Sequence, residues 1–188
     1  MAFKGKVISN PVTGQQIKFI QTAKDTNGQL LEMESVYAAA SKEPPPHYHP
    51  YQAEDFTILE GEMTVRMNGG LTVLKKGDSL HVPANTVHSM WNDTSSVAIV
   101  NWKVQPAMNT EYFFENAMGL AQDGKTKADG MPRFLQVVLL ASKYSGTFRL
   151  VKPPFAVQKI LFTVLKPFAY LAGYRPGYSK YESGDIEG

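Results

Sequence analysis

Short segments of β-type sequence, separated by turn residues, fill the first hundred residues of this chain and constrain its fold more than any other feature. From about residue 5 to residue 105, apolar or alternating runs are interrupted by turn signals such as Asn27-Gly28, Gly61 and Asn68-Gly69. An Asn-Gly pair favours a tight turn because both residues tolerate positive φ. About ten such segments at close spacing predict an all-β barrel or sandwich.

The pattern changes to helical periodicity after Pro106. Thr110 is in a position to cap a first helix, and Pro132 suits the first turn of a second. The helical segments that we expect cover residues 111–121, 133–144 and 156–174. We therefore expect a β-barrel over residues 1–106 and a helical extension over 107–188 that packs on the barrel within the same compact unit.

The third helical segment carries one continuous apolar stripe. Its members recur at intervals of three and four residues, which is the spacing of one helix face: Val157, Ile160, Leu161, Val164, Leu165, Phe168 and Leu171. A stripe of this size should be covered by the barrel and the preceding helix, or by a second copy of the chain, in preference to a lipid surface. Pro167 is expected to kink or interrupt the helix, and with Lys159 and Lys166 it argues against a membrane span.

The composition argues against several classes of protein. The net charge of +2 is too small to indicate nucleic acid binding, although it divides into −3 over residues 1–120 (9 Lys+Arg, 12 Asp+Glu) and +5 over residues 121–188 (10 and 5). The chain has no Cys, which leaves no disulfides and no thiolate metal ligands. The first ten residues lack the apolar segment of a secretory signal, which together with the absence of Cys favours a cytoplasmic location.

Histidines supply the chemically informative pattern. His47 and His49 are two residues apart, and side chains at that spacing on a strand point to the same face, roughly 6.6 Å apart along the chain. Two imidazoles that lean toward each other from such positions can share a metal ion at about 2.0–2.2 Å. Glu54 follows after a short break, and His88 lies on a later strand after a turn at Pro83.

These spacings resemble the two signature motifs of the cupin superfamily. The first motif, His-x-His followed by four residues, Glu, six residues and Gly, is matched by His47, His49, Glu54 and Gly61. A Pro-rich segment at 44–46 precedes it, as in the family.

The second cupin motif is matched by Gly77, Pro83, His88 and Asn92, with fifteen residues between Gly61 and Gly77. The chain departs from the pattern at Asn85, where the family prefers Gly. Asn adopts the left-handed conformation more readily than other non-Gly residues, so the turn is expected to persist. The resemblance thus implies a jelly-roll-like antiparallel β-barrel.

In cupins, three His and one Glu bind a single metal ion inside the barrel, and the resemblance implies the same role for His47, His49, Glu54 and His88. Three imidazoles and a carboxylate suit Fe, Mn, Ni, Cu or Zn rather than Ca or Mg. If the ion is six-coordinate, two positions remain open for substrate or dioxygen. The resemblance also favours a homodimer, since cupins are commonly dimers.

Two functions fit this set of residues. The first is a mononuclear metal enzyme, a dioxygenase-like oxidoreductase acting on a small oxygen-bearing substrate, with Glu54 both a ligand and a catalytic proton acceptor. Quercetin-type dioxygenation is the family chemistry nearest to this ligand set, and isomerase or lyase chemistry comes next. The alternative is a non-catalytic small-molecule-binding cupin whose metal is structural or orients the ligand. The cupin fold hosts all of these, so the fold alone does not choose between them.

Several neighbouring residues have simpler explanations. His81 is expected to hydrogen-bond across the barrel strands and Asn92 to secure a turn. Met90 shares strand parity with His88, and Phe56 and Ile58 share it with Glu54, so these three face the same interior. They could line a substrate pocket or simply fill the core.

Overall fold

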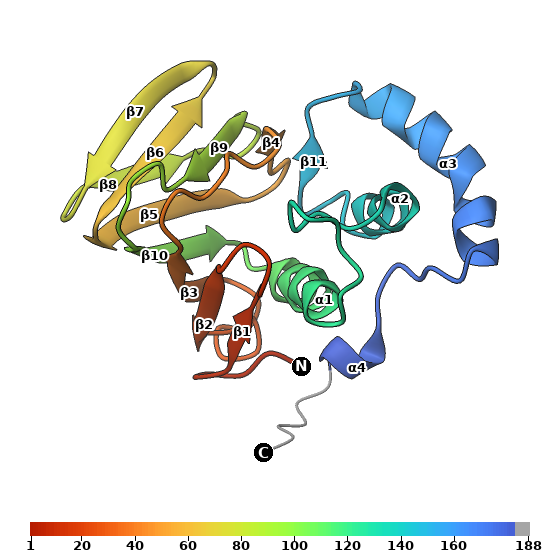
Figure 1. The fold of residues 1–188 in the computed structure, drawn as a ribbon, viewed down its shortest axis with the longest axis horizontal. Helices are drawn as coiled ribbons and strands as arrows, with labels where there is room; N and C mark the ends of the chain where they lie inside the picture. Colours follow the sequence, from red (N-terminus) through yellow and green to blue (C-terminus); the bar gives the residue numbers. More distant parts are fainter. Residues whose placement is uncertain (183–188) are drawn as a thin grey trace.

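The structure is a computed structural model and describes residues 1–182 (Figure 1). Ten strands come first, as the turn pattern predicts: β1 (Val7–Ser9), β2 (Gln16–Gln21), β3 (Leu31–Tyr37), β4 (His47–Tyr48), β5 (Ala53–Glu60), β6 (Glu62–Met67), β7 (Gly70–Lys75), β8 (Ser79–Val82), β9 (His88–Trp91) and β10 (Ala98–Gln105). The later elements are α1 (Thr110–Gln122), α2 (Phe134–Lys143), β11 (Arg149–Leu150), α3 (Phe155–Leu171) and α4 (Ser179–Glu182).

The strands form two antiparallel sheets. One has the order β1-β2-β3-β10-β5-β8, and the other has the order β11-β4-β9-β6-β7. This confirms a mainly β, jelly-roll-like fold with C-terminal helices, although the strands pair as two sheets and not as one closed barrel. The two-residue strand β11 was not expected, because a segment this short has no detectable period.

Alternation along the strands builds the core between the sheets. In β10, Ala98, Val100, Trp102 and Val104 are buried while the residues between them are not, as the period of two requires. The main core cluster contains these four side chains together with residues of both sheets, among them Phe56, Ile58, Met63, Val65 and Met90. Phe56, Ile58 and Met90 therefore point inward, as their parity predicts.

Two turn residues show why their backbone conformation matters. Asn85 has φ of +66°, so the left-handed turn survives without Gly, and its N–H donates to the carbonyl of His49 at 2.7 Å. Gly61 has φ of +74°, and a Cβ placed there would lie 2.6 Å from the carbonyl oxygen of Val97. Both turns therefore position the strands that carry the histidines and Glu54.

Gln52 connects the sheets to the start of α1 through buried hydrogen bonds. The Nε2 of Gln52 donates to the carbonyl of Pro106 at 2.8 Å and to the hydroxyl of Thr110 at 2.8 Å. Thr110 is the first residue of α1, and neither it nor the N-cap Asn109 makes a side-chain capping bond. The expected capping role of Thr110 is therefore wrong, because its hydroxyl accepts from Gln52.

The other helices differ slightly from expectation. α2 begins at Phe134, with Arg133 as its N-cap, so Pro132 precedes the helix instead of lying in its first turn. α3 continues through Pro167 to Leu171 and is not interrupted there. Within residues 1–182, no helix has both the length and the apolar character needed to cross a membrane. The expected boundary between barrel and extension at residue 106 stays a prediction.

The apolar stripe of α3 lies differently from the expected arrangement. α3 packs on α2 through Phe162 and Leu165, and α2 lies between it and the sheets (Figure 1). Of the seven stripe residues, only Leu165 contacts this cluster, whereas Ile160 is 71% exposed and Leu171 is 86% exposed. Of the two covers expected for the stripe, the barrel and α2 are not the one, and a second copy of the chain stays a prediction. Periodicity identifies an apolar face but does not tell which side of a wide apolar arc meets the neighbouring helix.

Candidate metal centre

The structure brings together all four residues that the motifs single out. His47 lies on β4, His49 just after it and His88 on β9, while Glu54 comes from β5 of the other sheet. His47 and His88 are direct cross-strand partners. His49, Glu54 and His88 are buried, and His47 is partly exposed. The four side chains thus meet between the two sheets, with His47 on the more open side.

Distances within the cluster suit a shared ion. Ligand nitrogens of the three histidines all lie within 4.8 Å of one another. The Oε2 atom of Glu54 is 2.8 Å from Nε2 of His88 and 3.3 Å from Nε2 of His49. Two ligands at right angles, each about 2.1 Å from an ion, stand about 3.0 Å apart. The observed separations are those of neighbouring ligands.

Backbone carbonyls determine which ring nitrogen of each histidine faces the centre. The Nδ1 atoms of His47, His49 and His88 contact the carbonyls of Pro45 (3.1 Å), Thr147 (2.8 Å) and Thr86 (3.0 Å). A carbonyl oxygen can only accept a hydrogen bond, so each Nδ1 carries the proton. In the neutral ring Nε2 then presents a lone pair, which is the form that binds a metal ion.

Two buried polar atoms at the centre lack a partner within the described chain, namely Nε2 of His49 and Oε2 of Glu54. Buried polar atoms are rarely left unsatisfied. With neutral tautomers, lone pairs of His88 and Glu54 face each other across 2.8 Å, which is unfavourable unless a proton or a cation lies between them. The donor set therefore fits a metal ion.

Electrostatic interactions in the site favour the ionised form of Glu54 next to the histidines. Burial alone would raise the pKa of Glu54, but His49 and His88 outweigh it and hold this pKa below its ordinary value. Burial and the neighbouring imidazoles of His88 and His49 lower the pKa of His47 to about 3, so this ring is neutral at pH 7. Burial also acts to lower the pKa of His88, yet the carboxylate of Glu54, 2.8 Å away, outweighs burial and raises this pKa. A metal ion at this position would compete with a proton for Nε2 of His88.

Trp102 orients Glu54. Its indole Nε1 donates to Oε1 of Glu54 at 3.0 Å, so this oxygen is occupied and Oε2 is the one directed toward the histidines. Trp102 is buried in the main core cluster, and a buried indole N–H usually finds an acceptor. That general rule is the only signal in the sequence that could have linked Trp102 to the site.

Replacing Trp102 by Phe should weaken metal binding by about 10- to 100-fold, because partners that orient a ligand typically contribute that much. The variant keeps an aromatic ring in the core and loses only the hydrogen bond to Glu54. Competition with a chelator of known affinity would measure the change. Trp91→Phe is the matched control, since Trp91 is equally buried and packs near Arg66 instead of Glu54. Equal affinities in both variants would contradict this role for Trp102.

The C-terminal extension also contributes to the site, which the sequence did not predict. Thr147 supplies the carbonyl that holds His49, and Leu150 of β11 pairs with His47. The ring of Phe148 stands edge-on to His47 with centroids 6.5 Å apart, and Phe113 of α1 packs against Phe148 at 4.5 Å. A backbone carbonyl leaves no trace in a sequence pattern, so Thr147 could not be identified in advance.

The residues given simpler explanations behave as expected. The Nδ1 atom of exposed His81 lies 2.7 Å from Asp55 on the adjacent strand, away from His47, His49, Glu54 and His88. Buried Asn92 donates to the carbonyls of Ala38 and Ser96 and accepts from Thr94, and so secures the loop after β9.

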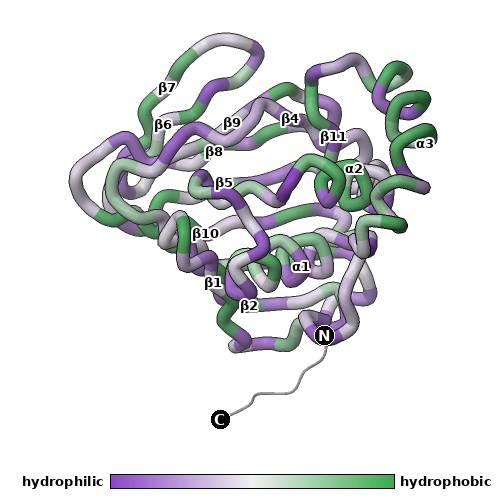
Figure 2. Tube along the Cα trace, turned by 45° about the vertical axis from the view of Figure 1, so that its right-hand side comes forward, coloured by the Kyte–Doolittle hydropathy of each residue, from purple (hydrophilic) through white to green (hydrophobic). Residues whose placement is uncertain are grey.

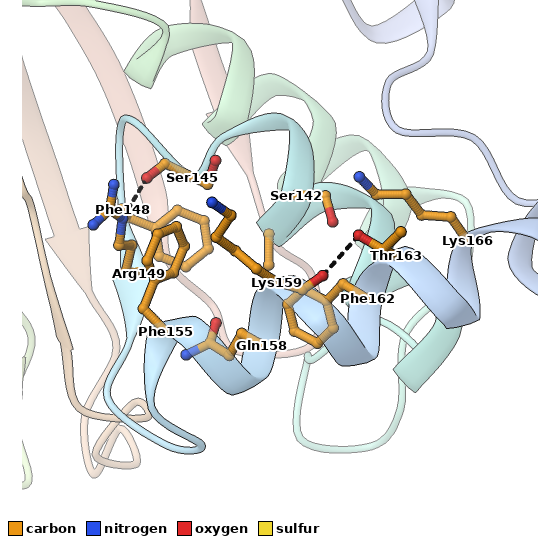
Figure 3. Close-up of a pocket in the computed structure, with 11 residues that line it drawn as sticks. Ser142, Ser145, Phe148, Arg149, Phe155, Gln158, Lys159, Phe162, Thr163 and Lys166 are labelled. Atoms are coloured by element: carbon orange, nitrogen blue, oxygen red, sulfur yellow. Dashed lines mark hydrogen bonds between the residues drawn. The ribbon is translucent and has the colours of Figure 1, made fainter.

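A separate cavity of about 170 Å³ lies between α2 and α3 (Figure 3). The guanidinium of Arg149 lies 3.7 Å from the ring centroid of Phe155 at one end, with Lys159 on the same side, and Lys166 lies at the other end (Figure 3). Phe148 lines this cavity and also stands edge-on to His47. None of the four clustered residues lines it.

Comparisons with known proteins agree with the geometry. The family model described as a cupin domain matches residues 33–102, which include all four clustered residues. A probable oxidoreductase of Hypocrea virens, virH, is 33% identical over 157 residues, which is 76% of this chain and 70% of that protein. The chain belongs to the cupin superfamily.

Two further similarities are more limited in extent. Quercetin 2,3-dioxygenase of Bacillus subtilis is 39% identical over 90 residues, which is 47% of this cupin but only 26% of that enzyme. Among solved structures, an RmlC-like cupin from Shewanella frigidimarina matches with a TM-score of 0.48 and 20% identity, over 59% of this chain and 94% of that one. The cupin family and the histidine cluster together point to a bound metal ion.

Proposed function

We propose that this cupin binds one divalent transition-metal ion through His47, His49, Glu54 and His88, and that it is a dioxygenase-like oxidoreductase. Its substrate would be a small organic molecule that carries oxygen donors. The observation that carries the proposal is that three histidine ligand atoms lie within 4.8 Å of one another, and that Nε2 of His88 and of His49 lie 2.8 Å and 3.3 Å from the buried Oε2 of Glu54.

The residues around the ion would have separate roles in binding and catalysis. The three imidazoles hold the ion, and their backbone carbonyl partners keep each ring in the binding tautomer. When bound, the ion supplies Lewis-acid and redox chemistry for an oxygen-bearing substrate. Glu54 is ionised, so it can accept a proton from a substrate hydroxyl at Oε2 while Trp102 holds Oε1.

The surroundings of the open side favour a flat apolar substrate. His47 is the partly exposed member of the cluster, and Phe148 stands beside it with Phe113 behind. Aromatic faces and edges bind other aromatic rings favourably and exclude water from the reacting atoms. A phenolic or diketone group could then approach Glu54 while its ring contacts Phe148.

The relatives suggest where to begin a search for substrates. One is named as a quercetin 2,3-dioxygenase and another as a probable oxidoreductase. The chain spans about a quarter of the length of the former. Flavonols are therefore the first compounds to test, followed by catechols and diketones.

Dioxygen uptake by metal-loaded protein would test the proposal. Protein loaded separately with Fe, Mn, Ni, Cu or Zn is offered each compound while dioxygen and products are measured, with chelator-treated protein as control. We expect metal-dependent uptake with at least one phenolic or diketone compound. Tight binding of such a compound without uptake or product would favour the alternative, a non-catalytic small-molecule-binding cupin. A homodimer and a cytoplasmic location stay predictions.

A further inference from the structure

α3 has an apolar side that nothing in the described chain covers. Figure 2 shows hydrophobic residues along this outer helix. The residues involved are 38–86% exposed: Val157, Ile160, Leu161, Val164, Phe168 and Leu171. We call these six residues the α3 seam. They lie on the side of α3 away from the buried residues Phe162 and Ala169, of which Phe162 packs with α2.

No charged residue lies within the α3 seam. The two lysines of α3, Lys159 and Lys166, line the cavity toward α2 instead (Figure 3). The seam residues follow intervals of three and four, the spacing by which one helix packs along another. A charge-free face of branched aliphatic side chains at this spacing suits a second helix.

We propose that the α3 seam pairs two copies of this chain in antiparallel orientation, around a two-fold axis at Val164. The seam is nearly symmetric in sequence about that residue. Val157 and Leu171 are each seven positions away, and Ile160 and Phe168 are each four positions away. Antiparallel pairing therefore places every one of these four against another apolar seam residue, and Val164 against its own copy, as a two-fold interface requires.

The available area is that of a stable dimer. From their exposed fractions, the six side chains present on the order of 650 Å² per chain, so pairing would bury about 1,300 Å², within the range of specific interfaces. Antiparallel helices also place opposite ends of their dipoles side by side, whereas parallel ones would place like ends together. The buried area and the orientation of the helix dipoles both favour a second copy of the chain as the partner of the α3 seam.

A lipid surface fits the seam less well. Helices that lie on membranes combine an apolar face with many basic residues that reach the headgroups. Here α3 has two lysines, and both line the cavity on the α2 side. The basic balance of the chain's last part is therefore not arranged around the seam.

The mass of the full-length protein in solution tests the pairing. Light scattering at about 20 μM should give twice the chain mass of 20.8 kDa. Val164→Asp should weaken association by about 30-fold or more and give a monomer, because each carboxylate would meet its own copy. Because Val164 is 60% exposed within the chain, this variant should keep its circular dichroism spectrum. Val73→Asp is the matched control, because Val73 is 52% exposed on the edge strand β7.

A cross-linking variant keeps the test decisive if Val164→Asp fails to fold. The chain has no Cys, so any disulfide formed by Val164→Cys must join two copies. Mild oxidation should convert most of this variant to a covalent dimer, while Thr163→Cys, one position away on the cavity side, should form little disulfide between chains. A wild type that is monomeric at 20 μM would overturn the proposal, as would a dimer abolished by Val73→Asp and not by Val164→Asp. Sedimentation of monomeric protein with phosphatidylserine vesicles would instead identify the seam as a lipid-binding face.

Discussion

Replacing His88 by Ala is expected to remove nearly all bound metal from the purified protein. Loss of one of four ligands should reduce affinity by more than about 100-fold, since even partners outside the ligand set account for 10- to 100-fold. The Nε2 atom of His88 also lies 2.8 Å from Oε2 of Glu54, closer than Nε2 of His49 at 3.3 Å. Elemental analysis after dialysis would measure metal per chain, with about one ion expected for the wild type.

Two further variants make the His88 result interpretable. His88→Ala leaves the carboxylate of Glu54 buried without a partner on that side, which can cost about 3–5 kcal/mol of stability. His47→Ala removes a partly exposed ligand instead and should lose metal with less damage to the fold. His81→Ala is the control, because His81 lies on the surface next to Asp55. Equal metal content in His47→Ala and wild type would show that His47 is not a ligand.

Glu54→Gln is expected to abolish turnover while leaving much of the metal in place. The single amide oxygen can ligate when it faces the histidines, which leaves the NH2 group toward Trp102 and costs the hydrogen bond from that indole. The amide cannot accept a proton from a substrate hydroxyl. Loss of a general base typically lowers kcat by about 10²- to 10⁴-fold. The measurement is kcat with whichever compound supports dioxygen uptake, normalised to the metal content of each preparation.

Asp55→Asn is the matched control for Glu54→Gln. Asp55 is adjacent in sequence but points to the outer surface, where it contacts His81. It should therefore leave both metal content and kcat unchanged. A Glu54→Gln protein with full metal and wild-type kcat would assign the carboxylate a ligand role only, and the proton would then have to go elsewhere.

Strand pattern and motif spacing allowed much of this cupin to be anticipated from its sequence. Alternation in β10 places Trp102 and its neighbours inside because strand geometry has a fixed period of two. The spacing of His47 and His49 places both rings on one side of a short strand for the same reason. The turn at Asn85 could be anticipated too, since its backbone requirement depends only on the residue itself.

Other features depend on contacts between segments far apart in the chain. The carbonyl of Thr147 meets His49 across 98 positions, and β11 pairs with β4 through only two residues. Neither contact could be predicted from the residue types or from the spacing of apolar residues in the segments that make it. The sequence also could not predict which side of α3 faces α2. The apolar face of this helix is wide enough that either edge could make the contact.

By itself, the sequence determined which residues are available for chemistry and which face of each strand they occupy, because these follow from residue type and local backbone geometry. Tertiary structure decided that Trp102 holds one oxygen of Glu54, that the helical extension holds His49, and that the α3 seam faces outward. Those outcomes depend on how helices and sheets pack. Packing is decided by the summed fit of many side chains, which no local pattern encodes.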